Sequence, residues 1–142
     1  MATESKLLVL SRRLAEQYVS NEPWACISIT DNEDRDAKIN KCQLQAVLRL
    51  KFEDVNLEGS ESFSDEQANQ ILDFVKKWWD KIETLVVHCY AGQCRSPAIA
   101  AIISKIYYGD DMFYFKRFTP NTLVFRKLYC AVNARDDFEN IR

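Results

Sequence analysis

Residues 85–97 read LVVHCYAGQCRSP, and in this stretch an apolar run ends abruptly at His88 and Cys89. Small and polar residues follow, and Arg95 then opens a segment with the start signals of a helix. A tight loop between a strand and a helix turns successive backbone N–H groups inward above the helix N-terminus, and these groups bind a dianion such as phosphate. We therefore expect a phosphate-binding loop that begins at Cys89 and ends at Arg95.

The sequence around this loop alternates between two kinds of pattern. Short apolar runs predict strands at residues 6–10, 24–30, 46–52 and 84–88. Helical patterns occur at residues 11–19, 64–82 and 96–108, and a last helix is expected to start at 119–120. Charged stretches at 31–36 and 53–62 have neither period and predict loops. The alternation indicates an α/β fold, with a central, mostly parallel sheet of about four or five strands flanked by helices.

Length and composition limit the class of protein. The 142 residues suit a single domain, 1–142, and 47% hydrophobic with 28% charged residues is typical of a soluble globular chain. A net charge of −2 argues against nucleic acid as a partner. The apolar run near the N-terminus is too short for a signal peptide or a membrane span. We expect a cytoplasmic protein with no membrane association.

The cysteine count argues against a disulfide framework and against zinc. The five cysteines are an odd number without a secretion signal, so reduced thiols are expected. His88 is the sole histidine, and we expect no bound metal. Buried core positions are expected for Cys26, Cys42 and Cys130.

Cys89 is instead interpreted as a nucleophile. Inward N–H dipoles, the helix N-terminus and the Arg95 guanidinium would all favour its thiolate. Arg95 offers a planar fork that can hold two phosphate oxygens. Gly92 permits the backbone turn, and the Ser96 hydroxyl is placed to donate a hydrogen bond to Cys89.

The order His88, Cys89, five residues, Arg95, Ser96 resembles the signature of the cysteine-dependent protein tyrosine phosphatases, in particular the small dual-specificity type and its compact bacterial members. The resemblance covers most of the chain, and it implies a tyrosine-phosphatase-like fold. It also implies that Asp54, in the segment 52–56, is the general acid, and that the buried His88 organises the loop.

The resemblance further implies hydrolysis of phosphotyrosine, with phosphoserine and phosphothreonine as a wider specificity, through a phosphocysteine and without a cofactor. The substrate would be a phosphorylated protein or peptide. Phosphate, sulfate or vanadate would bind the loop residues Tyr90, Ala91, Gly92, Gln93, Cys94 and Arg95.

Two departures from the dual-specificity pattern leave alternatives open. Cys94 stands where Ser or Gly is common, which is similar to the loop of low-molecular-weight tyrosine phosphatases, and it could form a reversible disulfide with Cys89. Glu53 and Glu58 lie near Asp54, and either could share the acid role. Asp110 and Asp111 are weaker candidates, because neither precedes a proline.

Other functions remain possible from the sequence. One is a catalytically silent phosphate-binding module, and others are phosphatases for a phosphoinositide or an RNA 5′-phosphate. The loop contains no lysine to attract a polyanionic group, which disfavours a phosphoinositide. Arsenate reduction would need further resolving thiols. The aromatic run 113–118 is expected to pack against the core under a loop, and oligomeric state and exact specificity stay open.

Overall fold

The computed structural model describes residues 5–142, which fold around one four-stranded parallel sheet. The strands pair in the order β1-β4-β2-β3. Their bounds are β1 (Leu7–Ser11), β2 (Trp24–Thr30), β3 (Leu44–Lys51) and β4 (Thr84–Cys89). The predicted α/β fold is confirmed, and the central position of β4 places its C-terminal residue, Cys89, in the middle of the sheet edge.

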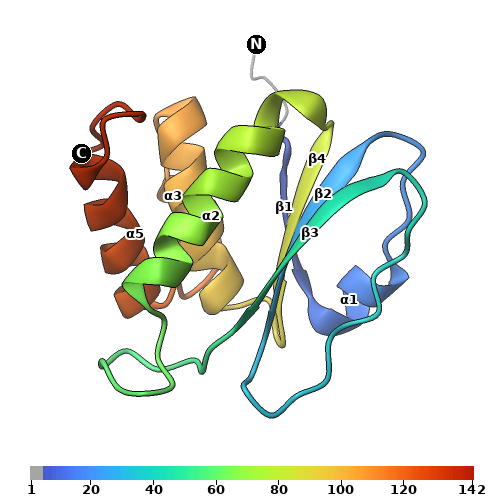
Figure 1. Ribbon diagram of the computed structural model, residues 1–142, viewed down its shortest axis with the longest axis horizontal. Coiled ribbons are helices and arrows are strands. Elements are labelled where there is room, and N and C mark those ends of the chain that lie inside the picture. The colour runs from blue at the N-terminus through green and yellow to red at the C-terminus, as the bar shows by residue number, and fades with distance from the viewer. Residues whose placement is uncertain (1–4) are drawn as a thin grey trace.

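Helices cover both faces of the sheet unequally (Figure 1). Three long helices lie on one face: α2 (Asp65–Trp78), α3 (Arg95–Tyr108) and α5 (Thr122–Ala134). The short α1 (Arg12–Gln17) lies on the opposite face. The chain also forms a 3₁₀ turn, η1 (Trp79–Lys81), and a short helix, α4 (Met112–Arg117). None of the helices in residues 5–142 combines the length and apolar character that crossing a membrane requires.

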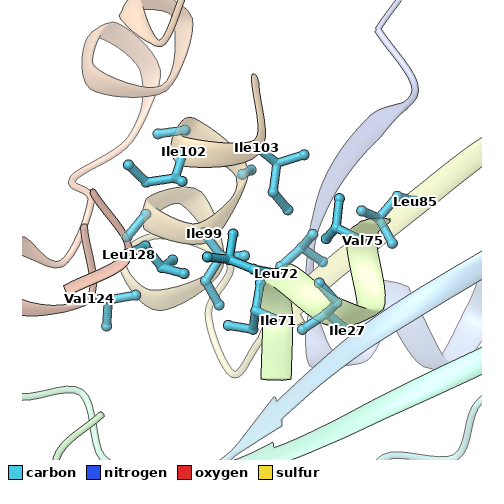
Figure 2. Close-up of a cluster of buried hydrophobic side chains, with 14 of the residues drawn as sticks. Ile27, Ile71, Leu72, Val75, Leu85, Ile99, Ile102, Ile103, Val124 and Leu128 are labelled. Atoms are coloured by element: carbon cyan, nitrogen blue, oxygen red, sulfur yellow. The ribbon is translucent and has the colours of Figure 1, made fainter. Parts of the chain in front are cut away.

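The alternation of side chains along β2 divides the apolar residues into two clusters. Ala25, Ile27 and Ile29 join the large core beneath the long helices, whereas Trp24 and Cys26 join a smaller cluster on the α1 face. Figure 2 shows part of the large core, where side chains of the sheet meet those of the three long helices: Ile27, Ile71, Leu72, Val75, Leu85, Ile99, Ile102, Ile103, Val124 and Leu128. Residues 95–104 of α3 are all buried, so this helix is the centre of the core, as its apolar sequence predicts.

The helix predicted from residue 64 onward is confirmed at α2. Ser64 accepts a hydrogen bond from the Gln67 N–H at 3.1 Å, and the Gln67 side chain accepts one from the Ser64 N–H at 3.0 Å. Near the end of this helix, Trp79 is buried and Trp78 is half-buried. The capping box thus fixes where α2 starts, directly after the loop 53–62.

Three predictions about the periphery were wrong. The last helix starts at Thr122 rather than at 119–120, because the Asn121 side chain caps it by accepting from the Val124 N–H at 3.0 Å. Cys42 and Cys130 are exposed rather than buried. Cys130 lies on α5 at a position that faces solvent, and Cys42 lies in the loop before β3. Apolar composition alone does not distinguish the inner from the outer side of an element.

The aromatic run 113–118 also differs from the prediction in part. Most of it forms α4, and Tyr114 packs into the core at 5% exposure. Phe113 and Phe115 remain 58% and 44% exposed, so only part of the run is packing. α4 therefore turns one side toward the core and leaves the other exposed.

Candidate active site

The loop between β4 and α3, residues 89–95, is called the Cys loop from here on. Its outward-facing carbonyl oxygens accept backbone N–H groups of other segments at 2.9–3.0 Å: Arg12 donates to Tyr90, Thr119 to Gln93 and Asn121 to Cys94. In a trans peptide the N–H points opposite to the C=O, and residues 5–142 contain no cis peptide. The N–H groups of residues 91, 94 and 95 therefore point into the loop, where they can surround an anion.

Gly92 is required by both conformation and space. Its φ is +71°, in the left-handed region that other residues rarely adopt. A Cβ at this position would lie 2.8 Å from the backbone carbon of Leu10 and the nitrogen of Ser11. The Cys loop therefore lies directly against the end of β1, and any larger residue would push them apart.

Cys89 is buried at the base of a pocket of about 380 Å³. Its sulfur lies 3.2 Å from the hydroxyl oxygen of Ser96, in the first turn of α3. A hydroxyl at this distance can donate to a thiolate. Cys89, Arg95 and Ser96 are therefore brought together as the sequence predicts. Of the other loop residues, Tyr90, Ala91 and Cys94 line the pocket, whereas Gly92 and Gln93 line a second hollow toward β1.

Arg95 is held by one of its three side-chain nitrogens. Its Nη1 donates to the Asp31 carboxylate at 2.6 Å and to the Phe52 carbonyl at 2.9 Å. Within residues 5–142, Nε and Nη2 form no hydrogen bond, so that edge of the guanidinium is left for a bidentate contact with a ligand. Arg95 is only 5% exposed, and the Asp31 carboxylate balances its charge.

His88 supports the loop from below. Its Nδ1 lies 3.2 Å from the Cys89 carbonyl oxygen. Because a carbonyl oxygen can only accept a hydrogen bond, the proton of the neutral ring lies on Nδ1. Nε2 then accepts from the Ser28 hydroxyl at 2.6 Å. Burial lowers the pKa of His88 to about 4. The imidazole is fully buried and neutral, and it therefore links two central strands rather than exchanging protons with a substrate.

Asp54 lines the same pocket as Cys89 and Arg95, and one residue of a distant helix cap holds it. Asn121 Nδ2 donates to Asp54 Oδ1 at 2.7 Å and to the Val55 carbonyl at 3.0 Å. The Asn121 backbone also donates to Cys94. This one asparagine joins the start of α5, the Cys loop and the loop carrying Asp54. Its amide contacts Oδ1 of Asp54 and does not donate to Oδ2.

The two glutamates considered as alternative acids lie in different places. Glu58 is exposed and pairs with Lys127, whose hydrogen bond lowers the pKa of Glu58. It does not line the pocket. Glu53 does line the pocket, but its carboxylate accepts from the Asn32 N–H at 2.8 Å. Asp110 and Asp111 lie at the start of α4 and are not among the pocket residues either.

Cys94 has surroundings unlike those of Cys89. It is half-buried at the start of α3, and burial together with the nearby Asp54 carboxylate raises its pKa. A thiol that faces a carboxylate stays protonated to higher pH. Cys94 is therefore kept as a thiol.

Sequence reasoning missed two residues of this site, Asp31 and Asn121. The charged stretch 31–36 predicts a loop, although Asp31 follows β2 directly, where ligand-binding residues of parallel sheets are found. The start signal at 119–120 predicts a helix there and gives no role to Asn121. Its position next to Pro120 does fit a helix cap, but its contacts with Asp54 and the Cys loop involve segments far away in the sequence.

Comparisons with known proteins identify the fold. No model of a known protein family matches the sequence, and no curated protein matches it. Solved structures do match. The structure of human DUSP28 is 17% identical, with a TM-score of 0.66, and the match covers 91% of this chain and 92% of that chain. A mouse putative dual specificity phosphatase, complexed with zinc tungstate, is 17% identical with a TM-score of 0.63, covering 89% and 81%.

A third match is the human tyrosine phosphatase-like serine/threonine/tyrosine-interacting protein. It is 22% identical with a TM-score of 0.59, and the match covers 80% of each chain. The chain thus has the fold of the tyrosine and dual-specificity phosphatases, as the resemblance in the Cys loop implies. At these identities the likeness concerns the fold, and the chemistry has to be argued from the residues of the pocket.

Proposed function

We propose that this protein is a phosphatase that hydrolyses phosphotyrosine in proteins or peptides through a phosphocysteine intermediate. The observation that carries the proposal is the composition of the pocket. Cys89, Arg95 and Asp54 come from β4, α3 and the loop after β3, and they line one cavity. A nucleophile, a phosphate-binding fork and a proton donor are what transfer of a phosphoryl group to a thiolate requires.

In the proposed first step, the Cys89 thiolate attacks phosphorus and the bond to the leaving oxygen breaks. Asp54 gives its proton to that oxygen, so a neutral phenol or alcohol departs. Nε and Nη2 of Arg95 and the inward N–H groups of the Cys loop hold the equatorial oxygens of phosphorus. The Asp31 carboxylate keeps the guanidinium in this orientation through Nη1.

In the second step, Asp54 takes a proton from water, and the water oxygen displaces the Cys89 sulfur from phosphorus. The Ser96 hydroxyl, 3.2 Å from that sulfur, stabilises the thiolate as it departs. Phosphate leaves and Asp54 is protonated again. No metal or cofactor enters this scheme, because Arg95 and the loop amides balance the charge on phosphorus.

The charge of the pocket favours a protein substrate over a polyanion. Three carboxylates, those of Asp31, Glu53 and Asp54, line the cavity beside Arg95, its one arginine. They would repel the additional phosphates of a phosphoinositide or the neighbouring phosphates of RNA. Exposed Tyr90 and Val55 lie at the rim, where an aryl ring can pack against them. Phosphoserine and phosphothreonine remain the wider specificity to test.

The proposal is tested with p-nitrophenyl phosphate and phosphorylated peptides, using wild type and Cys89→Ser in parallel. We expect turnover by the wild type only, competitive inhibition by phosphate, sulfate and vanadate, and a phosphate group on Cys89 after rapid quenching and mass spectrometry. Full turnover by Cys89→Ser would contradict the covalent mechanism. A wild-type protein that binds phosphate without any turnover would instead be the silent binding module.

A further inference from the structure

A second hollow, of about 810 Å³, lies beside the proposed active site. Its walls are the whole of β1, Leu14 of α1, residues 91–93 of the Cys loop and residues of α4 and its C-terminal end. We call it the β1–α4 groove. Ala91 lines both this groove and the pocket that holds Cys89, so the two hollows meet at the Cys loop.

One wall of the groove is an unpaired strand edge. β1 is the last strand of the sheet and pairs only with β4 among the described residues. The Lys6 carbonyl accepts from the Leu85 N–H, and the Arg12 N–H donates to the Tyr90 carbonyl. Even-numbered residues of β1 therefore turn their backbone groups toward β4. The N–H and C=O of Val9 and the C=O of Leu7 therefore face the groove and can pair with an additional strand, whereas the Leu7 N–H donates to Ser5 Oγ and Gly92 lies against the Ser11 nitrogen.

The flanks of this edge are apolar and exposed. Leu14 is 51% exposed on one side of β1, and Phe113 is 58% exposed on the other. Arg117 adds one positive charge to the lining, and it forms no ion pair within residues 5–142. An unpaired edge between apolar side chains is the arrangement in which an extended peptide adds a strand to a sheet.

We propose that the β1–α4 groove binds an extended, apolar segment of the phosphorylated protein, which pairs with β1 while its phosphorylated residue enters the pocket of Cys89. We assign the substrate as the occupant because the groove adjoins the pocket of Cys89, with Ala91 lining both. The segment would have apolar side chains at every second position, and it would carry an acidic residue opposite Arg117. This inference rests on the proposed function.

The test compares phosphotyrosine peptides that share one core sequence. Each is made with and without a threonine–valine repeat of about six residues on one side or the other. We expect the extension on one side to raise kcat/KM about tenfold. Alternate amides of a paired strand face β1. N-methylation of every second amide should remove the gain when the methylated amides are those that face β1, and should leave it when they are the amides that face away.

Matched variants locate the effect. Phe113→Glu should abolish the gain and leave turnover of p-nitrophenyl phosphate unchanged, because that small substrate does not reach the groove. Met112→Glu is the control: Met112 is 51% exposed on the same helix but does not line the groove. Equal loss in both variants, or no gain from any extension, would overturn the inference.

Two further readouts separate this inference from the proposed function. If no phosphorylated compound is hydrolysed, the proposed function fails, and the groove is then tested by fluorescence anisotropy with the unphosphorylated repeat. Binding that Phe113→Glu weakens and Met112→Glu does not would support a peptide groove on its own, whereas no binding would overturn it. Sedimentation equilibrium examines the competing occupant: a dimer that Phe113→Glu dissociates would show that a second copy fills the groove.

Discussion

The two halves of the proposed site are built in opposite ways. The Cys loop joins a buried strand to a buried helix, so apolar packing on both sides fixes its position. The acid loop, residues 53–62, is largely exposed, and polar contacts from α5 and its cap hold it: Asn121 with Asp54, Thr122 with Asn56 at 2.9 Å, and Lys127 with Glu58. The proposed nucleophile thus depends on the core, whereas the proposed proton donor depends on single surface contacts.

The largest effect should come from removing the proposed acid, Asp54. Asp54→Asn keeps the shape and the contact with Asn121, but the amide cannot deliver a proton. With phenyl phosphate, a poor leaving group, kcat should fall about 10²–10³-fold. With p-nitrophenyl phosphate the fall should be less than about tenfold, because that leaving group needs little protonation.

Steady-state kinetics with both substrates measure this difference, and Glu53→Gln and Glu58→Gln are the matched controls. Equal falls on both substrates would contradict the acid role of Asp54. A fall of the same kind in Glu53→Gln would move that role to Glu53.

Lowering the pH should destabilise the protein at the Cys-loop half, because His88 is buried in the core beneath that loop. Burial lowers the pKa of His88 from its ordinary 6.5 to about 4, so the unfolded chain binds a proton between these values and the folded protein does not. Stability should therefore be full above pH 6.5 and decrease as the pH falls toward 4. The loss in the free energy of unfolding should be about 3 kcal/mol.

Urea unfolding at a series of pH values measures this loss. His88→Asn lacks the titration, so its stability should change less over the same range, whatever its absolute stability. Parallel curves for the two proteins would show that the imidazole does not carry the pH dependence.

The contact between Asp31 and Arg95 is where the acidic side of the pocket touches the Cys-loop half. Asp31→Asn removes the charge but keeps an oxygen near Nη1. A charge-assisted hydrogen bond then becomes an ordinary one, and kcat should fall about tenfold. Asp34→Asn, in the same loop, should not change kcat. Unchanged kcat and unchanged phosphate inhibition in Asp31→Asn would contradict the positioning role.

Asn121 separates the structural task of a helix cap from the positioning of the acid. Asn121→Ala loses the cap of α5 and should lower the free energy of unfolding by about 1 kcal/mol. Asn121→Asp keeps a capping oxygen but sets a carboxylate beside Asp54. It loses the amide that donates to Asp54 and to the Val55 carbonyl, so its stability should also decrease, while the basic limb of the pH–rate profile moves to higher pH. Identical pH–rate profiles for wild type and Asn121→Asp would contradict the proposal that Asn121 positions Asp54 as the acid.

The smallest effect on basal turnover is expected at Cys94. We propose that peroxide converts the Cys89 thiolate to a sulfenic acid, which Cys94 then attacks to form a disulfide with loss of water. A dithiol should restore activity in the wild type and not in Cys94→Ser. Because burial and Asp54 raise the pKa of Cys94, disulfide formation should be slow near neutral pH. Equal recovery of activity in the wild type and in Cys94→Ser would contradict a protective disulfide between Cys89 and Cys94.

Local sequence predicted the Cys-loop half well. Apolar runs, the capping box at Ser64 and the glycine at position 92 each act within a few residues, and these features set strands, helices and the loop. The position of Cys89 next to Ser96 follows from them, because a strand, a five-residue turn and a helix leave little freedom. The exposed Cys42 and Cys130 show the limit, since composition does not say which side of an element faces solvent.

By itself, then, the sequence determined the α/β fold, the parallel sheet and the loop that carries Cys89 and Arg95, because all of these depend on neighbours along the chain. Only the tertiary structure decided that Asp31 would hold Arg95 across 64 positions and Asn121 would hold Asp54 across 67. It also left β1 with β4 as its one partner strand among residues 5–142, beside the Cys loop. The physical reason is that the sheet order and the packing of α5 bring together polar groups whose separation in sequence carries no local signal.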